Sequence, residues 1–392
     1  MQLSNRANSV KPSATITINT KATQLKAQGI DVINLSVGEP DFDTPDFIKE
    51  AAIAAIKAGH TKYTAVDGIP ALKDAIIQKF KNENHLNYTR EQILVSCGAK
   101  QSIYNLTQAV LNDGDEVIIP APYWVSYPAM VALADGKSII VNTTIENRFL
   151  LTAEELENAI TPKTRLLILN RPSNPTGMAY KKSDLEKLAA VLLKYPNVMI
   201  ITDDMYEHIL WGINPYVNIL NVCPELADRT IVCNGVSKSY AMTGWRIGYA
   251  AGPVAIIKAM TKIQSHSTSN PTSISQYAAI AALQGDHHFI DNIKNIFKER
   301  HDCIQQKLAA IPGVICPPAD GAFYVFPNVE KAIARLGLKD DIALSELILE
   351  KAHVAAVPGT EFGAPRFIRL SYATNIETLE SAVKRMEPFI RG

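Results

Sequence analysis

The sequence lacks the features that mark secreted, metal-binding and membrane-spanning proteins. Its five cysteines are scattered, odd in number and without C-x-x-C spacing, so neither a disulfide framework nor a metal knuckle is expected. No apolar run reaches the ~18 residues that a bilayer span needs. Residues 1–10 contain no signal-peptide core. We therefore predict a cytoplasmic protein with no bound metal and no membrane association.

An excess of charge of either sign is also missing. The 39 basic and 39 acidic residues cancel, which argues against nucleic acid as a partner. Neither a Gly-x-Gly-x-x-Gly loop nor a complete Gly-x-x-x-x-Gly-Lys-Ser/Thr loop is present, which argues against a nucleotide-dependent dehydrogenase. What remains is an apolar fraction of 47% and a charged fraction of 20%, values typical of globular proteins.

Short apolar runs alternate with helical patterns through much of the chain. This rhythm predicts an α/β fold, with a large domain whose mostly parallel sheet is flanked by helices and a smaller α+β domain. A long helical tract over roughly 272–310 interrupts the alternation. We expect 1–45 to form an N-terminal arm and part of the small domain, 46–275 the large domain, and 276–392 the small C-terminal domain. The strands are predicted at 32–35, 93–96, 116–120, 138–141, 165–169, 198–202, 230–233, 321–326, 354–357 and 366–372.

The first 16 residues are polar and show no helix-capping signal. They are expected to form an arm that packs on another part of the protein or stays mobile. In the predicted large domain, the ends of the parallel strands carry polar and aromatic side chains. Ligands gather at this edge of such sheets, so these strand ends hold the candidate site.

Lys238 stands in an unusual setting, between Ser237 and Ser239 just after an apolar run. Desolvation disfavours a charged lysine, and a neutral lysine is a nucleophile that forms Schiff bases with carbonyls. Arg246, eight residues further on, is suited to hold an anion such as a phosphate. An ordinary loop lysine is the alternative, since most lysines are solvated.

Three other strand ends carry candidate groups. The run 93–96 leads into small residues and a helix start near Ala99 and Lys100, which suits an anion. The run 198–202 ends at Asp203, a candidate partner for a ring N–H⁺, whereas Asp204 is expected to cap a helix. Asn174 precedes a proline, so that peptide bond is a candidate for the cis form.

Aromatic and cationic residues complete the set. Trp124 suits stacking on a flat ring, with plain packing as the alternative. Tyr206 is placed to donate to a phenolic oxygen. Arg369 lies within an apolar strand and must face an anion, either a substrate carboxylate or a structural ion-pair partner. Together these groups describe a pyridoxal phosphate site.

With these residues in place, the sequence resembles the class I, fold type I aminotransferases, from about residue 11 to the C-terminus. The prokaryotic-type aspartate aminotransferase subgroup, some of whose members use prephenate, is most similar. The resemblance rests on the segments 35–45 (Leu-Ser-Val-Gly-Glu-Pro-Asp-Phe-Asp-Thr-Pro), 122–128 (Pro-Tyr-Trp-Val-Ser-Tyr-Pro), 172–177 (Pro-Ser-Asn-Pro-Thr-Gly), 237–238 with 244–248 (Ser-Lys and Gly-Trp-Arg-Ile-Gly) and 367–373 (Phe-Ile-Arg-Leu-Ser-Tyr-Ala).

The resemblance implies a role for each candidate in a pyridoxal 5′-phosphate site. Lys238 would bind the cofactor covalently and shuttle the proton. Asp203 would pair with the ring nitrogen, Tyr206 and Asn174 would bond the ring hydroxyl oxygen, and Trp124 would stack. The implied phosphate ligands are Arg246, Ser237, the backbone at Ala99 and Lys100, and Tyr63 donated to the neighbouring subunit of a homodimer.

Substrate recognition is implied by the same resemblance. Arg369 and the Gly38 backbone would bind the α-carboxylate, assisted by Trp124 and Asn174, and Lys100 the distal carboxylate. Lys11 matches a position associated with prephenate. Arg171 and Asp204 depart from the usual serine and glutamate, and Arg171 is expected to add a cation near the site.

The predicted activity is transamination from aspartate to 2-oxoglutarate, giving oxaloacetate and glutamate, with prephenate as a further substrate. An aromatic, alanine or kynurenine-type aminotransferase is the alternative within the class. A binding protein that keeps the fold without turnover is the alternative outside it. It has little support, because every catalytic position is filled and no DNA-binding domain is appended.

Overall fold

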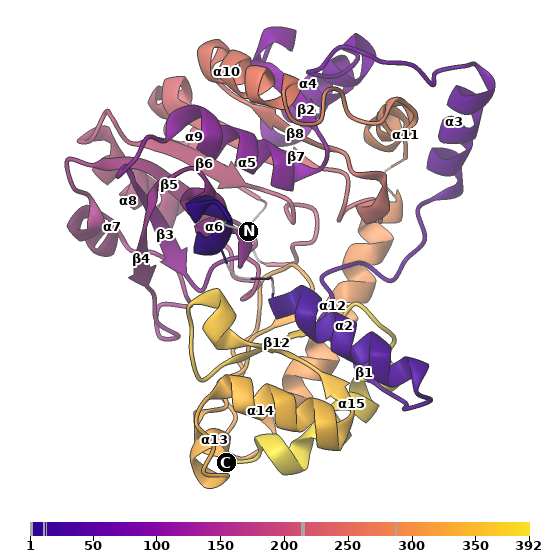
Figure 1. The fold of residues 1–392 in the computed structure, drawn as a ribbon, viewed down its shortest axis with the longest axis vertical. Helices are drawn as coiled ribbons and strands as arrows, with labels where there is room; N and C mark the ends of the chain where they lie inside the picture. Colours follow the sequence, from indigo (N-terminus) through magenta and orange to yellow (C-terminus); the bar gives the residue numbers. More distant parts are fainter. Residues whose placement is uncertain (1–2, 11, 13, 213–215, 287) are drawn as a thin grey trace.

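The computed structural model describes residues 3–10, 12, 14–212, 216–286 and 288–392, and its centre is a seven-stranded sheet (Figure 1). The strand order is β2-β8-β7-β6-β5-β3-β4. The four pairings among β7, β6, β5, β3 and β4 are parallel, while β8 runs antiparallel to both of its neighbours. The sheet strands are β2 (Ile93–Ser96), β3 (Glu116–Ala121), β4 (Lys137–Asn142), β5 (Thr164–Asn170), β6 (Met199–Asp203), β7 (Thr230–Gly235) and β8 (Gly248–Ala251).

The mostly parallel sheet confirms the predicted fold class, and its central strands are buried as the apolar runs indicated. Two apolar clusters line opposite faces of the sheet, because alternate residues of a strand point to opposite sides. Leu166 and Ile168 of β5 belong to one cluster, and Leu167 and Leu169 to the other.

Helices cover both faces of this sheet and continue into the rest of the chain (Figure 1). The N-terminal and sheet-flanking helices are α1 (Asn5–Ser9), α2 (Ala14–Ala27), α3 (Asp46–Lys57), α4 (Pro70–Asn84), α5 (Ala99–Val110), α6 (Ser126–Leu133), α7 (Ala153–Ala159), α8 (Lys182–Leu193), α9 (Ile219–Val222), α10 (Val254–Ser265) and α11 (Ser273–Gln284). The later helices are α12 (His288–Ala309), α13 (Glu330–Arg335), α14 (Asp341–Leu347) and α15 (Ile376–Ile390).

Short strands form two further sheets in the lower part of Figure 1. Strands β11 (Val357–Pro358), β12 (Ile368–Ser371) and β9 (Tyr324–Val325) pair antiparallel, in that order. Strand β1 (Ile33–Asn34) pairs in parallel with β10 (Val354–Ala355), which brings an N-terminal segment beside C-terminal ones. The division of the chain at residues 45 and 275 stays a prediction.

The structure corrects several local predictions. The arm is not uncapped: Oγ of Ser4 accepts a hydrogen bond from the Ala7 amide at the start of α1, which packs on α6. The long helical tract is two helices, α11 and α12, separated around Gly285. No helix begins at Asp204, because residues 205–208 form a turn. The strand β8 was not predicted, since Gly-Tyr-Ala-Ala has little of the β-branched character typical of strands.

Candidate active site

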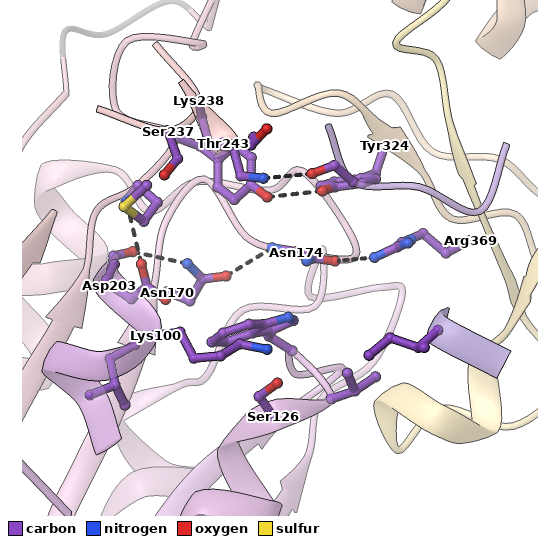
Figure 2. Close-up of a pocket in the computed structure, with 18 of the residues that line it drawn as sticks. Lys100, Ser126, Asn170, Asn174, Asp203, Ser237, Lys238, Thr243, Tyr324 and Arg369 are labelled. Carbon is purple, nitrogen blue, oxygen red and sulfur yellow. Dashed lines mark hydrogen bonds between the residues drawn. The ribbon is translucent and has the colours of Figure 1, made fainter. Parts of the chain in front are cut away.

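A cavity of about 320 Å³ lies where the parallel strands end. It gathers side chains that follow β3, β5, β6 and β7, together with the helix start that follows β2. Strands β9 and β12 contribute Tyr324 and Arg369 from the other side (Figure 2). The predicted residues that line it are Gly38, Ala99, Lys100, Trp124, Asn174, Asp203, Tyr206, Ser237, Lys238, Arg246 and Arg369.

Two of the residues singled out in the sequence, Tyr63 and Arg171, do not line this cavity. Tyr63 is 91% exposed and does not line the cavity of its own chain. Lys11 lies outside the described residues. Arg171 is buried and does not line the cavity, although Asn170, which precedes it in the chain, does, so the expected cation near the site stays a prediction. Its guanidinium lies 3.9 Å from a carboxylate oxygen of Asp204, between the rings of Tyr180 and Tyr216.

Lys238 reaches the cavity from the segment after β7, and its environment favours the neutral amine. Its Nζ donates a hydrogen bond to the Gly38 carbonyl at 2.5 Å and lies 5.8 Å from the centre of the Phe323 ring. Burial lowers the pKa of Lys238 to about 8, the nearby Glu39 opposing this shift and Arg369 and Arg246 adding to it. About a tenth of the amine is then neutral at pH 7, far more than for an ordinary lysine, and the neutral form is the one that a nucleophile or proton acceptor requires.

Asp203 ends β6 on the strand next to the one that leads to Lys238. Its Oδ2 accepts a hydrogen bond from the Tyr127 hydroxyl at 2.5 Å. Burial raises the pKa of Asp203 to about 6, while the hydrogen bond from Tyr127 lowers it. Asp203 is buried, with 5% of its surface exposed, and among the described residues no cation forms an ion pair with it. A buried carboxylate without a cation is costly, so this site is suited to a cationic group of a ligand.

The start of α5 forms an anion site with Arg246. Gly98 is the N-cap, at φ +85°, and no side chain caps the helix. A Cβ on Gly98 would lie 2.4 Å from Nη2 of Arg246, and one on Gly248 would lie 2.1 Å from the Ala99 amide nitrogen. The two glycines let the arginine and the helix start come together. First-turn amides and a guanidinium are donors that suit a phosphate.

Arg369 is 2% exposed, and no carboxylate pairs with it in the part of the chain that the structure describes. Its Nη1 donates to Oδ1 of Asn174 at 3.0 Å and its Nη2 to the Ser36 carbonyl at 2.6 Å, while Nε lacks a partner among those residues. Among the described residues, Arg369 is therefore not part of a structural ion pair, which was the alternative interpretation. A buried cation with only neutral partners is suited to an anionic ligand.

Trp124 and Asn174 lie between these groups. The Trp124 ring lines the cavity, and Nζ of Lys100 lies 4.9 Å from its centre. Burial lowers the pKa of Lys100, and the charge of Arg246 acts in the same direction. The peptide bond between Asn174 and Pro175 is cis, as predicted. The backbone N–H of Asn174 donates a hydrogen bond to Oδ1 of Asn170, which fixes the turn at the end of β5.

The structure adds site residues that the sequence analysis missed. Tyr127 lies inside the segment 122–128 and Asn170 directly follows the predicted strand 165–169, so their positions were a usable signal. Tyr324 had none, because its strand belongs to a different sheet and looks like ordinary core. Ile16, Ile103, Val125, Ser126, Met205 and Thr243 also line the cavity.

The fold and cavity define a class of protein: an α/β protein whose cavity, at the ends of parallel strands, gathers a buried amine, a buried carboxyl group, an anion-binding helix start and a buried arginine. The family model "Aminotransferase class I and II" matches residues 30–386. The chain belongs to this aminotransferase family, whose aspartate-type members depend on pyridoxal phosphate. Within the described residues, no helix is both long and apolar enough to cross a membrane.

Named relatives align over nearly the whole chain. An aspartate/prephenate aminotransferase of Nitrosomonas europaea is 54% identical, covering 98% of this chain and 99% of its own. An aspartate aminotransferase of Geobacillus stearothermophilus is 50% identical, and each chain is covered completely. The crystal structure of the aspartate aminotransferase from Rhizobium meliloti superimposes with a TM-score of 0.95 at 45% identity, covering 100% of this chain and 99% of that one.

Proposed function

We propose that the protein is a pyridoxal-phosphate-dependent aspartate aminotransferase, which converts aspartate and 2-oxoglutarate into oxaloacetate and glutamate. The observation that carries this proposal is the placement of Lys238, a lysine whose pKa is lowered to about 8, in one cavity with Asp203 and with Arg369, which has no carboxylate partner among the described residues. The named relatives support the choice of aspartate. Because relatives at this level of identity are named for prephenate too, we propose prephenate as a second substrate.

The residues of the cavity fit the proposed cofactor. The helix start at Ala99, with Arg246, Ser237 and the Lys100 backbone, would hold its phosphate, and Asp203 would pair with its ring nitrogen. Tyr206 and Asn174 would bond its ring hydroxyl oxygen, and Trp124 would cover one face. When bound, pyridoxal phosphate supplies a carbonyl that condenses with amines and a ring that withdraws electrons from the bond being broken.

The side chains then divide the work of transamination. With the cofactor bound, Nζ of Lys238 would be the group that accepts the proton from the substrate Cα and carries it across the site. Asp203, when ionised, would pair with the protonated ring nitrogen of the bound cofactor and keep that proton in place. Arg369 and the Gly38 backbone bind the α-carboxylate and so orient the Cα–H bond towards Lys238.

Lys100 is the proposed ligand for the distal carboxylate, because its Nζ lies over Trp124 in the cavity. Half-reactions of the cofactor-loaded protein with aspartate, glutamate, prephenate and phenylalanine, followed at the cofactor's absorbance, test the function. We expect aspartate to react efficiently, and Lys100→Ala to lower kcat/KM for aspartate about 10²-fold while phenylalanine turnover is kept. Lys100→Arg keeps the cation and serves as the matched control. A protein that never absorbs in the visible range, or that transaminates only phenylalanine, would contradict the proposal.

The proposed active unit is a homodimer. Tyr63 is almost fully exposed, and the nearby α3 presents Ile53 and Ile56 at 49% and 52% exposure. Exposed apolar side chains on one helix are suited to a partner surface, and Tyr63 would then donate to the phosphate of the second subunit. We expect sedimentation equilibrium to give twice the mass of the chain, and Tyr63→Phe to weaken cofactor binding with Tyr195→Phe as a control. Full activity of a monomer would rule this assembly out.

A further inference from the structure

Tyr324 of β9 contacts three of the proposed ligand-binding residues, although it lies in a different sheet from most of the site. Its hydroxyl lies 2.9 Å from the hydroxyl of Tyr206. Its ring lies 4.6 Å from the guanidinium carbon of Arg369. Tyr324 is 1% exposed overall and lines the cavity. It therefore lies buried between the groups proposed for the ring hydroxyl oxygen and for the substrate carboxylate.

The third contact is with Gly38. A Cβ built on Gly38 would lie 2.3 Å from the Tyr324 hydroxyl oxygen, so this oxygen fits directly against the glycine. The Gly38 carbonyl in turn accepts the hydrogen bond from Nζ of Lys238. Only glycine leaves room for the hydroxyl to reach Tyr206.

The chemistry of Tyr206 decides the direction of the bond between the two tyrosines. Each hydroxyl has one proton to donate. If the Tyr206 proton points into the cavity, its oxygen is free to accept the proton of Tyr324. A donor that itself accepts a hydrogen bond is polarised and donates more strongly.

We propose that Tyr324 is a positioning residue for the reaction: its hydroxyl donates to the Tyr206 oxygen, so that the Tyr206 hydroxyl is aimed at the phenolic oxygen of the bound cofactor. The proposal rests on the proposed function, because it needs the cofactor's phenolic oxygen in front of Tyr206. Tyr324 acts only through Tyr206 and touches no reacting atom.

The proposal predicts a direction for a measurable titration. A hydrogen bond from Tyr206 stabilises the deprotonated phenolic oxygen, which makes the proton at Nζ of Lys238 easier to remove. Loss of that support raises the pH midpoint of the cofactor's absorbance change. The charged and titratable groups that face these atoms stay unchanged in the test; they are Glu39, Asp203, Lys238, Arg246 and Arg369.

The test is spectrophotometric titration of the cofactor-loaded protein without substrate. We expect Tyr324→Phe to raise the midpoint by about 0.5 pH unit, and Tyr206→Phe to raise it further. The double variant should match Tyr206→Phe alone, because Tyr324 acts through the Tyr206 oxygen. Tyr372→Phe is the matched control: its hydroxyl is equally buried and donates to the Ala322 carbonyl at 3.2 Å, outside the cavity, so no shift is expected.

Gly38→Ala provides a second, independent variant. Its Cβ would push the Tyr324 hydroxyl away from Tyr206 and raise the midpoint, whereas in a Tyr324→Phe background the nearest ring carbon is 3.4 Å away and the methyl group fits. We expect the midpoint of the Gly38→Ala/Tyr324→Phe double variant to equal that of Tyr324→Phe.

Three results would overturn the proposal. They are an unchanged midpoint in Tyr324→Phe, an equal shift in the Tyr206→Phe background, and a shift of the same size in Tyr372→Phe. Failure of the proposed function looks different, because the unmodified protein would then bind no cofactor and show no visible band at all, which would remove both proposals.

Discussion

Replacing Lys238 with alanine is expected to lower transamination by more than about 10⁴-fold, because the variant loses both the covalent attachment and the proton carrier. Lys238→Arg should be as inactive, since an arginine keeps the positive charge and cannot act as a neutral base. The arginine variant separates covalent attachment and proton transfer by Lys238 from simple phosphate binding, for which any cation would suffice. Steady-state kinetics with aspartate, with Lys194→Ala as a surface control, measures the effect. Activity retained in Lys238→Arg would contradict the assignment.

The unmodified protein should show the lowered pKa of Lys238 directly. In the cofactor-free protein, its Nζ should react with an aldehyde and borohydride with a pH midpoint of about 8, against 10.5 for an ordinary lysine. The neutral form dominates above the midpoint, so labelling rises with pH through this range. Peptide mass spectrometry identifies the labelled residue. A midpoint near that of surface lysines would show that the cavity does not desolvate the amine.

Asp203→Asn is expected to reduce turnover by about 10²- to 10⁴-fold, because an amide cannot hold a proton on the ring nitrogen. The Asn side chain is close in volume, so the fold should persist, and Asp203→Glu should recover part of the activity. Cofactor affinity of the unmodified protein should fall as the pH drops below about 6, where Asp203 becomes protonated. This dependence should be absent from Asp203→Asn. An Asn variant with normal turnover would exclude the proposed pairing.

In the cofactor-free protein, the Asp203 carboxyl group makes the folded state less stable as the pH rises, whereas a rise in pH favours cofactor binding. Its pKa is raised from 3.8 to about 6 on folding, so the folded chain binds this proton more tightly than the unfolded chain. The stability that Asp203 contributes is therefore fully present below about pH 4 and is lost as the pH rises to about 6. Thermal melts of Asp203→Asn should lack this loss.

Much of the site was predictable because the strands of a parallel sheet end at one edge. The apolar runs before Asn170, Asp203 and Ser237 each predicted a strand. The polar residues at the ends of these strands were therefore expected to lie together at one edge of the sheet. The cis peptide bond after Asn174 followed from local sequence. Predictions that needed distant partners did less well: Asp204 was expected to cap a helix, and its carboxylate instead lies near Arg171.

Tyr324 and β8 show why the remainder was not predictable. The four residues of β8 carry no strand pattern of their own, and their pairing with both β2 and β7 exists only in the folded sheet. Tyr324 looks like a core residue of a short strand, and its contacts join residues 38, 206 and 369. Such contacts depend on long-range packing, which no local periodicity records.

The amino-acid sequence by itself determined the chemistry: Lys238 among small residues, an aspartate at a strand end, an arginine within an apolar strand, and the family to which they belong. The tertiary structure alone decided how those groups act. It desolvates Lys238 and Asp203, leaves Arg369 without a carboxylate partner among the described residues, and sets Tyr324 behind Tyr206. The reason is physical, since charge states and hydrogen-bond partners depend on burial and distance, which arise only when separate segments pack together.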